Sequence, residues 1–131
     1  MSHRKSAVVS LLLASAFVLS AALAVAGTAS TRWAHIPVRE HTRQNPMSGQ
    51  PEAVAAGALV YREHCLQCHK ADAKGDGHKR PPLRSDRIRE ASDGDLEWFL
   101  RQGDLGHGMP SWSSLPEAQR WQIVAYLRSI Q

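Results

Sequence analysis

The two cysteines of this chain lie three positions apart and are followed at once by a histidine, in the run Cys65-Leu66-Gln67-Cys68-His69. Cys-x-x-Cys-His is the attachment signature of c-type haem. Two thiols on one turn of backbone can add to the two vinyl groups along one porphyrin edge, and the histidine can bind the iron from the proximal side. The run therefore predicts one covalently attached haem c, with Cys65 and Cys68 as thioether donors and His69 as an iron ligand.

Cys-x-x-Cys alone also occurs in thioredoxin-like redox pairs, zinc sites and short-loop disulfides. A zinc site would need two more well-spaced ligands, and His64, His78 and His107 do not form a second ligand pair. A thioredoxin-like motif would follow a strand and open a helix, but no convincing run of alternating β-branched residues is present. The haem interpretation is favoured over these three.

The first 26 residues have the composition of a targeting segment. Arg4 and Lys5 precede an uncharged, mostly apolar run, Ser6 to Ala26, which ends in Ala24-Val25-Ala26. A basic start, an apolar middle and an Ala-x-Ala end are the three parts of a secretory signal peptide. The run is also nearly long enough to span a bilayer, so residues 6–26 could instead remain as a membrane tether. Either outcome predicts an exported protein that is periplasmic, soluble after cleavage or anchored facing the periplasm.

The basic character of the chain does not indicate a nucleic-acid partner. The full sequence has a formal net charge of +4, and without residues 1–26 it keeps 14 basic and 12 acidic residues. Two haem propionates would bring the net charge near zero. No Lys/Arg-rich run and no basic stripe interleaved with aromatic residues is present, so nucleic-acid binding is not expected.

Residues 27–50 form a polar segment rich in turn signals, among them Asn45-Pro46 and Ser48-Gly49. We expect either a linker that leads from a membrane anchor or an arm that lies over the domain. Met47 is a conceivable iron ligand, but a lone methionine in such a segment is more often only a side chain. Three apolar side chains could pack an arm locally: Trp33, Ile36 and Val38.

The folded domain is predicted to occupy residues 51–131 and to open with a helix. Proline is favoured at the first helical position, which Pro51 would take, and apolar residues then recur at helical spacing as far as Glu63. Gly57 interrupts this helix at a cost of about 1 kcal/mol relative to alanine. A glycine in such a place usually permits the close approach of another backbone, and Tyr61 would lie beside that contact.

Two further helices are expected. Ser92 can cap one of them, with Asp95 three residues later, and Gly103 would end it. The last is predicted over 115–130, with Ser114 and Glu117 as a capping box.

The loop between these two helices carries a candidate second iron ligand. Met109 lies forty residues after His69 and is bracketed by Gly108 and Pro110. A thioether is a soft ligand that raises the reduction potential of haem iron. His107 is the rival ligand, but it would need a different path of the loop, so Met109 is favoured.

A pair of prolines follows the loop after His69. The carbonyl of Pro81 could accept a hydrogen bond from the histidine ring, since metal-bound histidines generally donate their other N–H to such an acceptor. From the sequence alone, a loop that merely contains two prolines is an equally open interpretation.

The segment from Glu52 to the C-terminus resembles class I cytochrome c, the small monohaem domains of bacterial electron-transfer chains. The resemblance is carried by Gly57-x-x-x-Tyr61, Cys65-x-x-Cys68-His69, Pro81-x-Leu83, Met109-Pro110 and the final Ile123-Val124-Ala125-Tyr126-Leu127. It implies an all-α fold of three to four helices wrapped around one haem, with the first and last helices crossing at Gly57 and Tyr61 against Ile123 and Tyr126. It also implies His69 and Met109 as axial ligands, Pro81 as acceptor from the His69 ring, and Leu83 against the haem face.

With both axial positions filled, the iron could only cycle between its ferrous and ferric states. The expected function is therefore electron transfer between redox proteins rather than catalysis, with a dehydrogenase, a quinol-oxidising complex or a terminal oxidase as partner. Two alternatives stay open. The chain could be the electron-transfer subunit of a specific dehydrogenase or oxidase, or, without a Met109 ligand, a five-coordinate haem enzyme or gas sensor.

Overall fold

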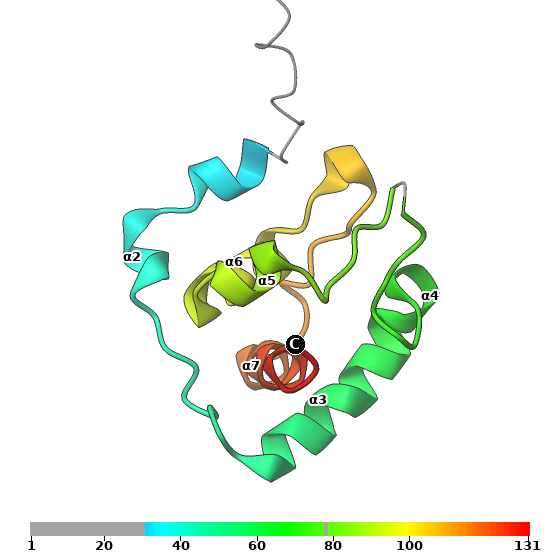
Figure 1. The fold of residues 1–131 in the computed structure, drawn as a ribbon. Coiled ribbons are helices and arrows are strands. Elements are labelled where there is room, and N and C mark those ends of the chain that lie inside the picture. The colour runs from blue at the N-terminus through cyan, green and yellow to red at the C-terminus, as the bar shows by residue number, and fades with distance from the viewer. Residues whose placement is uncertain (1–30, 78) are drawn as a thin grey trace, which may run out of the picture. The chain divides into compact units, whose positions relative to one another are not determined.

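The computed structural model describes residues 31–77 and 79–131, so the predicted signal or anchor segment lies outside the described residues. This part of the chain is helical, with one isolated bridge between Asp104 and Met109 and no strand, which confirms the all-α prediction (Figure 1). No helix within it has the length and apolarity needed to cross a membrane. The elements are η1 (Thr31–His35), α2 (Val38–His41), α3 (Pro51–His64), α4 (Leu66–His69), α5 (Asp86–Glu90), α6 (Asp93–Gln102), η2 (Leu105–His107) and α7 (Glu117–Ser129).

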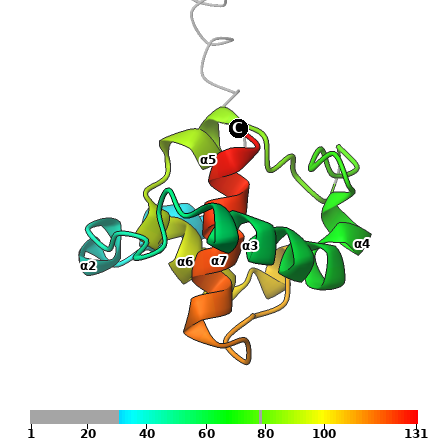
Figure 2. The ribbon, with the colours of Figure 1, turned by 90° about the horizontal axis from the view of Figure 1, so that it is seen from below.

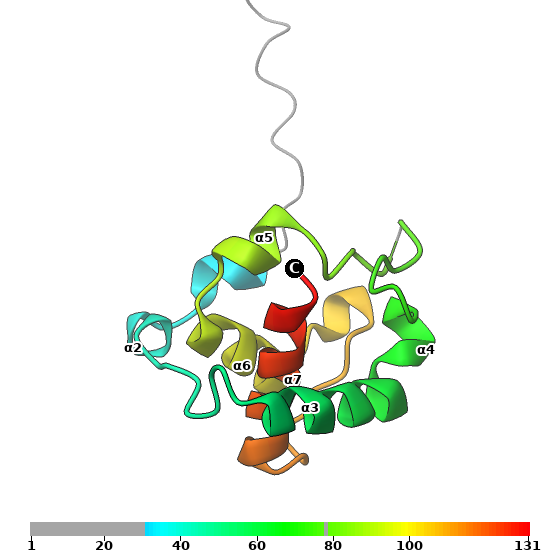
Figure 3. The same cartoon turned by 60° about the horizontal axis from the view of Figure 1, so that its bottom comes forward.

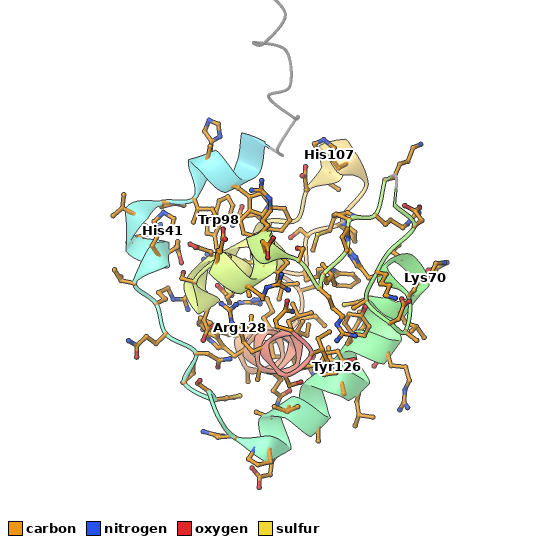
Figure 4. All side chains as sticks on the ribbon, viewed as in Figure 1. His41, Lys70, Trp98, His107, Tyr126 and Arg128 are labelled. Carbon is orange, nitrogen blue, oxygen red and sulfur yellow. The ribbon has the colours of Figure 1, made fainter. Side chains whose placement is uncertain are left out.

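The crossing of α3 and α7 is the main contact between helices, and Figure 2 shows α3 running across α7. Gly57 is buried there, and a Cβ at its position would lie 1.9 Å from the carbonyl oxygen of Gln122. One turn later the rings of Tyr61 and Tyr126 meet with centroids 5.1 Å apart, and Tyr126 lies between the two helices (Figure 4). The close approach predicted at Gly57 is thus confirmed.

The core lies where α3, α6 and α7 meet. Helix α7 supplies its most buried side chains, since Val124 is 0% and Ile123 1% exposed. Burial of such aliphatic side chains stabilises a fold by about 1.5–3 kcal/mol each. The other members of the buried cluster are Tyr61, Cys65, Ala73, Ile88, Leu96, Leu100, Trp121 and Leu127.

Helix α6 begins as predicted. The Ser92 hydroxyl accepts from the Asp95 N–H at 3.1 Å, and the Asp95 carboxylate accepts from the Ser92 N–H at 2.9 Å. These two bonds form a capping box.

The prediction for the start of the last helix was wrong. Helix α7 begins at Glu117 with Pro116 as its N-cap, and no side chain caps it. Pro116 is extended, with ψ of 143°, so Ser114 lies outside the first turn. The Glu117 carboxylate, which the capping box required, accepts instead from Arg43 and from the indole N–H of Trp121 at 3.2 Å.

Residues 33–50, which we call the arm, pack on α6 and α7. The Trp33 ring stacks on Phe99 with centroids 4.6 Å apart, and Ile36 is buried. The Asn45 amide donates to the carbonyl of Trp121 at 2.9 Å. Val38, in contrast, is 80% exposed, so the expectation that it helps to pack the arm was wrong.

A buried ionic cluster joins the arm to the helices. The residues Glu40 and Glu97 are 3% and 0% exposed, and Arg43 pairs with both carboxylates, at 3.2 and 2.8 Å. Arg101 also pairs with both, and Arg120 donates to Glu97 at 2.7 Å. Burial opposes ionisation of Glu40, but the guanidinium groups of Arg43, Arg101 and Arg39 outweigh it, so the pKa of Glu40 lies below its ordinary value. Buried carboxylates need such partners, because an unpaired one would be strongly destabilising.

The arm and the cysteine-bearing turn lie on different sides of the core. In three orientations, α2 is on one side of α7, while α4 and η2 are on the other (Figures 1, 2 and 3). Helix α2 therefore lies away from α4, which carries Cys68 and His69.

Candidate haem-binding site

The Cys-x-x-Cys-His run forms a continuous helical turn at the end of α3. The Cys65 N–H donates to the Tyr61 carbonyl at 2.8 Å, and the His69 N–H donates back to the Cys65 carbonyl at 2.8 Å. Cys65 is thus both the C-cap of α3 and the N-cap of α4. Both cysteines are free thiols, Cys65 buried and Cys68 half-buried. The turn thus places two free thiol groups on one short segment of backbone.

The two thiols have different surroundings. Burial, with a smaller contribution from the nearby Cys68, raises the pKa of Cys65 to about 12. The Arg80 guanidinium hydrogen-bonds the Cys68 side chain and also Asp76, and these contacts raise the pKa of Arg80. Cys65 therefore belongs to the apolar core, whereas the half-buried Cys68 lies beside the Arg80 guanidinium.

His69 is half-buried at the end of α4. Its Nδ1 is buried and makes no hydrogen bond of ordinary geometry with any part of residues 31–77 and 79–131. Burial lowers the pKa of the ring, while the backbone of Pro81 acts in the opposite sense. Burial thus favours the neutral imidazole, the form that binds metals.

The loop from Lys70 to Leu83 folds back over this turn. The Gly75 N–H donates to the His69 carbonyl at 3.1 Å, and the Leu83 N–H donates to the Ala73 carbonyl at 2.8 Å. Gly75 has φ of +65°, and a Cβ there would lie 1.9 Å from the Arg80 carbonyl oxygen. Only glycine fits such a close approach. Leu83, at the end of this loop, packs on the core.

The loop after α6 turns Met109 inward and His107 outward. Asp104 and Met109 exchange two backbone hydrogen bonds, at 2.8 and 3.0 Å, and the Met109 side chain packs against the buried core. The His107 side chain is 65% exposed, and its ring nitrogen lies 2.9 Å from the Asp104 carboxylate (Figure 4). The thioether and the imidazole thus take opposite sides of the loop.

The candidate residues fall into two groups. Cys65 belongs to the buried core cluster, and Leu83 and Met109 pack against that same cluster. Cys68 and His69 extend from it along α4, and Pro81 is exposed on the returning loop. Met47, weighed as a conceivable ligand, packs against the core from the arm.

One contact at the site was missed in the sequence. The Tyr61 hydroxyl donates to the Lys70 carbonyl at 2.8 Å, and Lys70 has φ of +65°. A lysine gives no signal for this backbone conformation, which normally favours glycine. The spacing of nine residues between donor and acceptor corresponds to no helical hydrogen bond, so only the folded chain reveals it.

Comparison with known proteins identifies the family of this domain. The family described as cytochrome C oxidase, cbb3-type, subunit III, matches residues 52–127. The cbb3-type cytochrome c oxidase subunit CcoP of Rhodobacter capsulatus is 37% identical over 97 residues, which cover 64% of this chain and 32% of the relative. The corresponding subunit FixP of Rhizobium meliloti is 34% identical over 64 residues, covering 48% and 22%. This chain thus spans about a third or less of these relatives.

The family match includes the Cys65–His69 turn, both sides of the α3–α7 crossing and the Met109 loop. It confirms the prediction of a c-type cytochrome domain that carries covalently attached haem c and its iron and takes part in electron transfer. Because the matched segment is more than half of its length, the chain belongs to the family of subunit III of cbb3-type cytochrome c oxidase.

Proposed function

We propose that this chain is the electron-transfer subunit of a cbb3-type terminal oxidase, with one haem attached at Cys65 and Cys68 and bound by His69 and Met109. The observation that carries the proposal is the α3–α4 turn. It presents two free thiols and an imidazole whose buried Nδ1 has no well-formed hydrogen bond among the described residues. These are the donors that covalent haem requires.

When bound, haem iron supplies reversible one-electron chemistry between its ferrous and ferric states. The residues of the chain then bind and enclose it. Cys65 and Cys68 would hold the group covalently, His69 would bind its iron from α4, and the Pro81 carbonyl would orient the His69 ring. Met109 serves as the second ligand, since it faces the core, whereas His107 faces solvent. Leu83 packs on the core beside Cys65 and helps to exclude water.

The curated relatives support the oxidase assignment over that of a freely diffusing carrier. Both are named as subunits of cbb3-type cytochrome c oxidase. The partner that receives the electron is therefore proposed to be the catalytic part of such an oxidase. Residues 1–26 would direct export, or residues 6–26 would tether the domain to the membrane facing the periplasm.

The haem assignment is tested by producing the full chain in a bacterium that matures c-type cytochromes. We expect a coloured protein whose mass exceeds that of the polypeptide by one haem and whose haem survives acid–acetone extraction. The double variant Cys65→Ala/Cys68→Ala should lose covalent attachment. A wild-type protein that is colourless, with its two cysteines joined to each other, would contradict the proposal.

The oxidase assignment needs a separate test. The full chain, produced in its natural host with an affinity tag at Gln131, should copurify with a haem–copper oxidase, and reduced haem should be oxidised faster when that complex is present. Recovery of a coloured protein that is soluble and free of any oxidase would favour an independent carrier. Tight binding of carbon monoxide to the native ferrous protein would instead favour a five-coordinate haem enzyme or sensor.

A further inference from the structure

A hydrogen bond links α3 to the peptide that follows His69. The Tyr61 hydroxyl donates to the Lys70 carbonyl oxygen at 2.8 Å, and Tyr61 itself is 2% exposed. The Lys70 carbonyl also accepts from the Ala73 N–H at 3.2 Å, while the Lys70 N–H donates to Leu66 at 2.9 Å. Lys70 is therefore held on both sides of its Cα.

The Lys70 backbone has φ of +65° and ψ of 166°. This region of conformational space is occupied almost solely by glycine, because a Cβ is strained there. The Lys70 side chain is exposed and points away from the core (Figure 4). The Lys70 ammonium donates to the Gln67 carbonyl at 3.4 Å, an exposed contact that Lys70→Gly and Lys70→Ala would lose alike. The other contacts that hold this conformation are the backbone hydrogen bonds and the Tyr61 hydroxyl.

The other end of the link is the helix crossing. The Tyr61 ring lies against Tyr126 of α7, one turn after the contact of Gly57 with Gln122. Tyr61 is thus fixed by tertiary packing on its ring and donates from its hydroxyl to the turn. The position of the turn is thereby coupled to the crossing of α3 and α7.

We propose that Tyr61 is a positioning residue for the haem-binding turn: its hydroxyl holds the strained Lys70 peptide and, through it, the backbone that orients the His69 ring. This proposal rests on the proposed role of His69 as an iron ligand. Loss of the hydroxyl lets Lys70 relax towards an ordinary φ, and the imidazole plane then rotates relative to the haem.

The test uses the full haem-loaded protein and compares Tyr61→Phe with Tyr126→Phe. Tyr126→Phe removes a hydroxyl from the same crossing but keeps the bond from Tyr61 to Lys70. The haem-methyl shifts in the NMR spectrum of the ferric protein report the orientation of the axial imidazole. We expect these shifts to change in Tyr61→Phe and to stay as in the wild type in Tyr126→Phe. The amide of Ala73 should also exchange faster, by at least tenfold, only in Tyr61→Phe.

A rescue experiment separates positioning from a general loss of stability. Lys70→Gly removes the Cβ and the strain, whereas Lys70→Ala removes the same charge but keeps a Cβ. The double variant Tyr61→Phe/Lys70→Gly should recover the wild-type yield of haem protein and its haem-methyl shifts, and Tyr61→Phe/Lys70→Ala should not.

The outcomes distinguish this inference from the proposed function. Coloured wild-type protein with identical shifts in Tyr61→Phe and Tyr126→Phe would overturn the positioning role alone. The same conclusion follows if glycine and alanine at position 70 have equal effects, or if Tyr61→Phe fails to mature and Lys70→Gly does not restore it. Colourless wild-type protein would overturn the haem assignment itself.

Discussion

Gly57 of α3 lies against Gln122 of α7 so closely that a Cβ on the glycine would come within 1.9 Å of the Gln122 carbonyl oxygen. The same Cβ would lie 3.0 Å from the Cβ of Tyr126. The two helices that build the domain therefore cross with their backbones in direct contact, and Tyr61 meets Tyr126 beside this point.

Gly57→Ala is expected to destabilise the protein. Alanine gains about 1 kcal/mol in helix propensity. Forced separation of two packed backbones costs about 3 kcal/mol or slightly more where a Cβ meets a carbonyl oxygen, so a net loss of about 2 kcal/mol is expected. Thermal unfolding of the haem protein measures it. Gly106→Ala is the control, because a Cβ there meets only the Asp104 carboxylate at 3.8 Å. Equal effects of the two substitutions would contradict a close crossing.

Trp33→Ala should loosen the arm. It removes the stacked contact with Phe99 and the cation–π contact with Arg87, whose guanidinium carbon lies 5.7 Å from the Trp33 ring. Because the indole is half-buried, we expect the free energy of unfolding to fall by about 1–3 kcal/mol. Denaturant unfolding measures the loss. Val38→Ala, on the same arm but exposed, should change stability by less than about 0.5 kcal/mol.

Glu40 makes the stability of the arm dependent on pH. Its pKa in the folded protein lies below the ordinary value of 4.5, because its arginine partners outweigh the effect of burial. The stabilisation is therefore present above pH 4.5 and is lost as the pH falls through the lowered value.

Glu40→Gln should remove this acid-sensitive component and lower stability at neutral pH by about 1.5–3 kcal/mol. Unfolding curves between neutral and acid pH measure both effects. Glu90→Gln, at an exposed position, serves as the control. If Glu40→Gln and the wild type lose stability in parallel as the pH falls, Glu40 does not contribute in this way.

Met109→Leu should remove the second iron ligand while nearly preserving side-chain volume. The near-infrared absorption band that reports methionine–iron ligation should disappear from the ferric spectrum. The reduction potential should fall by a sizeable part of the ~0.8 V range that axial ligands control. His107→Ala should change neither, since His107 is exposed beside Asp104. Absence of this band from the wild type, with a ferric spectrum that changes in His107→Ala and stays the same in Met109→Leu, would reverse the assignment.

Gly103→Ala should disturb the loop that carries Met109. Gly103 has φ of +65°, and a Cβ there would lie 2.5 Å from the carbonyl carbon of Pro110. We expect imidazole to displace the methionine from ferric iron at least tenfold more readily in this variant. Two causes act at Gly103, the backbone strain of a Cβ at positive φ and the clash of that Cβ with Pro110. Gly108→Ala separates them, because Gly108 also has positive φ, +81°, but nothing lies within 4 Å of its Cβ position. Gly108→Ala should show only the smaller effect of backbone strain, about 1–2 kcal/mol.

Local patterns in the sequence predicted the features that depend on neighbouring residues. The spacing of Cys65, Cys68 and His69 predicted covalent haem, the Ser92–Asp95 capping box predicted the start of α6, and Gly57 predicted a close helix contact. Hydrogen bonds within one turn and the reach of two thiols depend on a few adjacent positions, so they can be inferred without the fold. Ser114 and Glu117 show the limit, because α7 begins only after the extended Pro116 and the Glu117 carboxylate accepts from Arg43 and Trp121 instead.

The sequence by itself determined that this chain binds haem and contains helices, because the attachment motif and the helical periodicity are both local, and its resemblance to class I cytochrome c implied the all-α fold. Only the tertiary structure decided that the arm packs on α6 and α7, that Met109 faces the core while His107 faces solvent, and that Tyr61 holds Lys70. Each of these contacts joins segments that are distant in the sequence. Which segments meet is decided by the sum of many small packing and hydrogen-bonding energies over the whole domain.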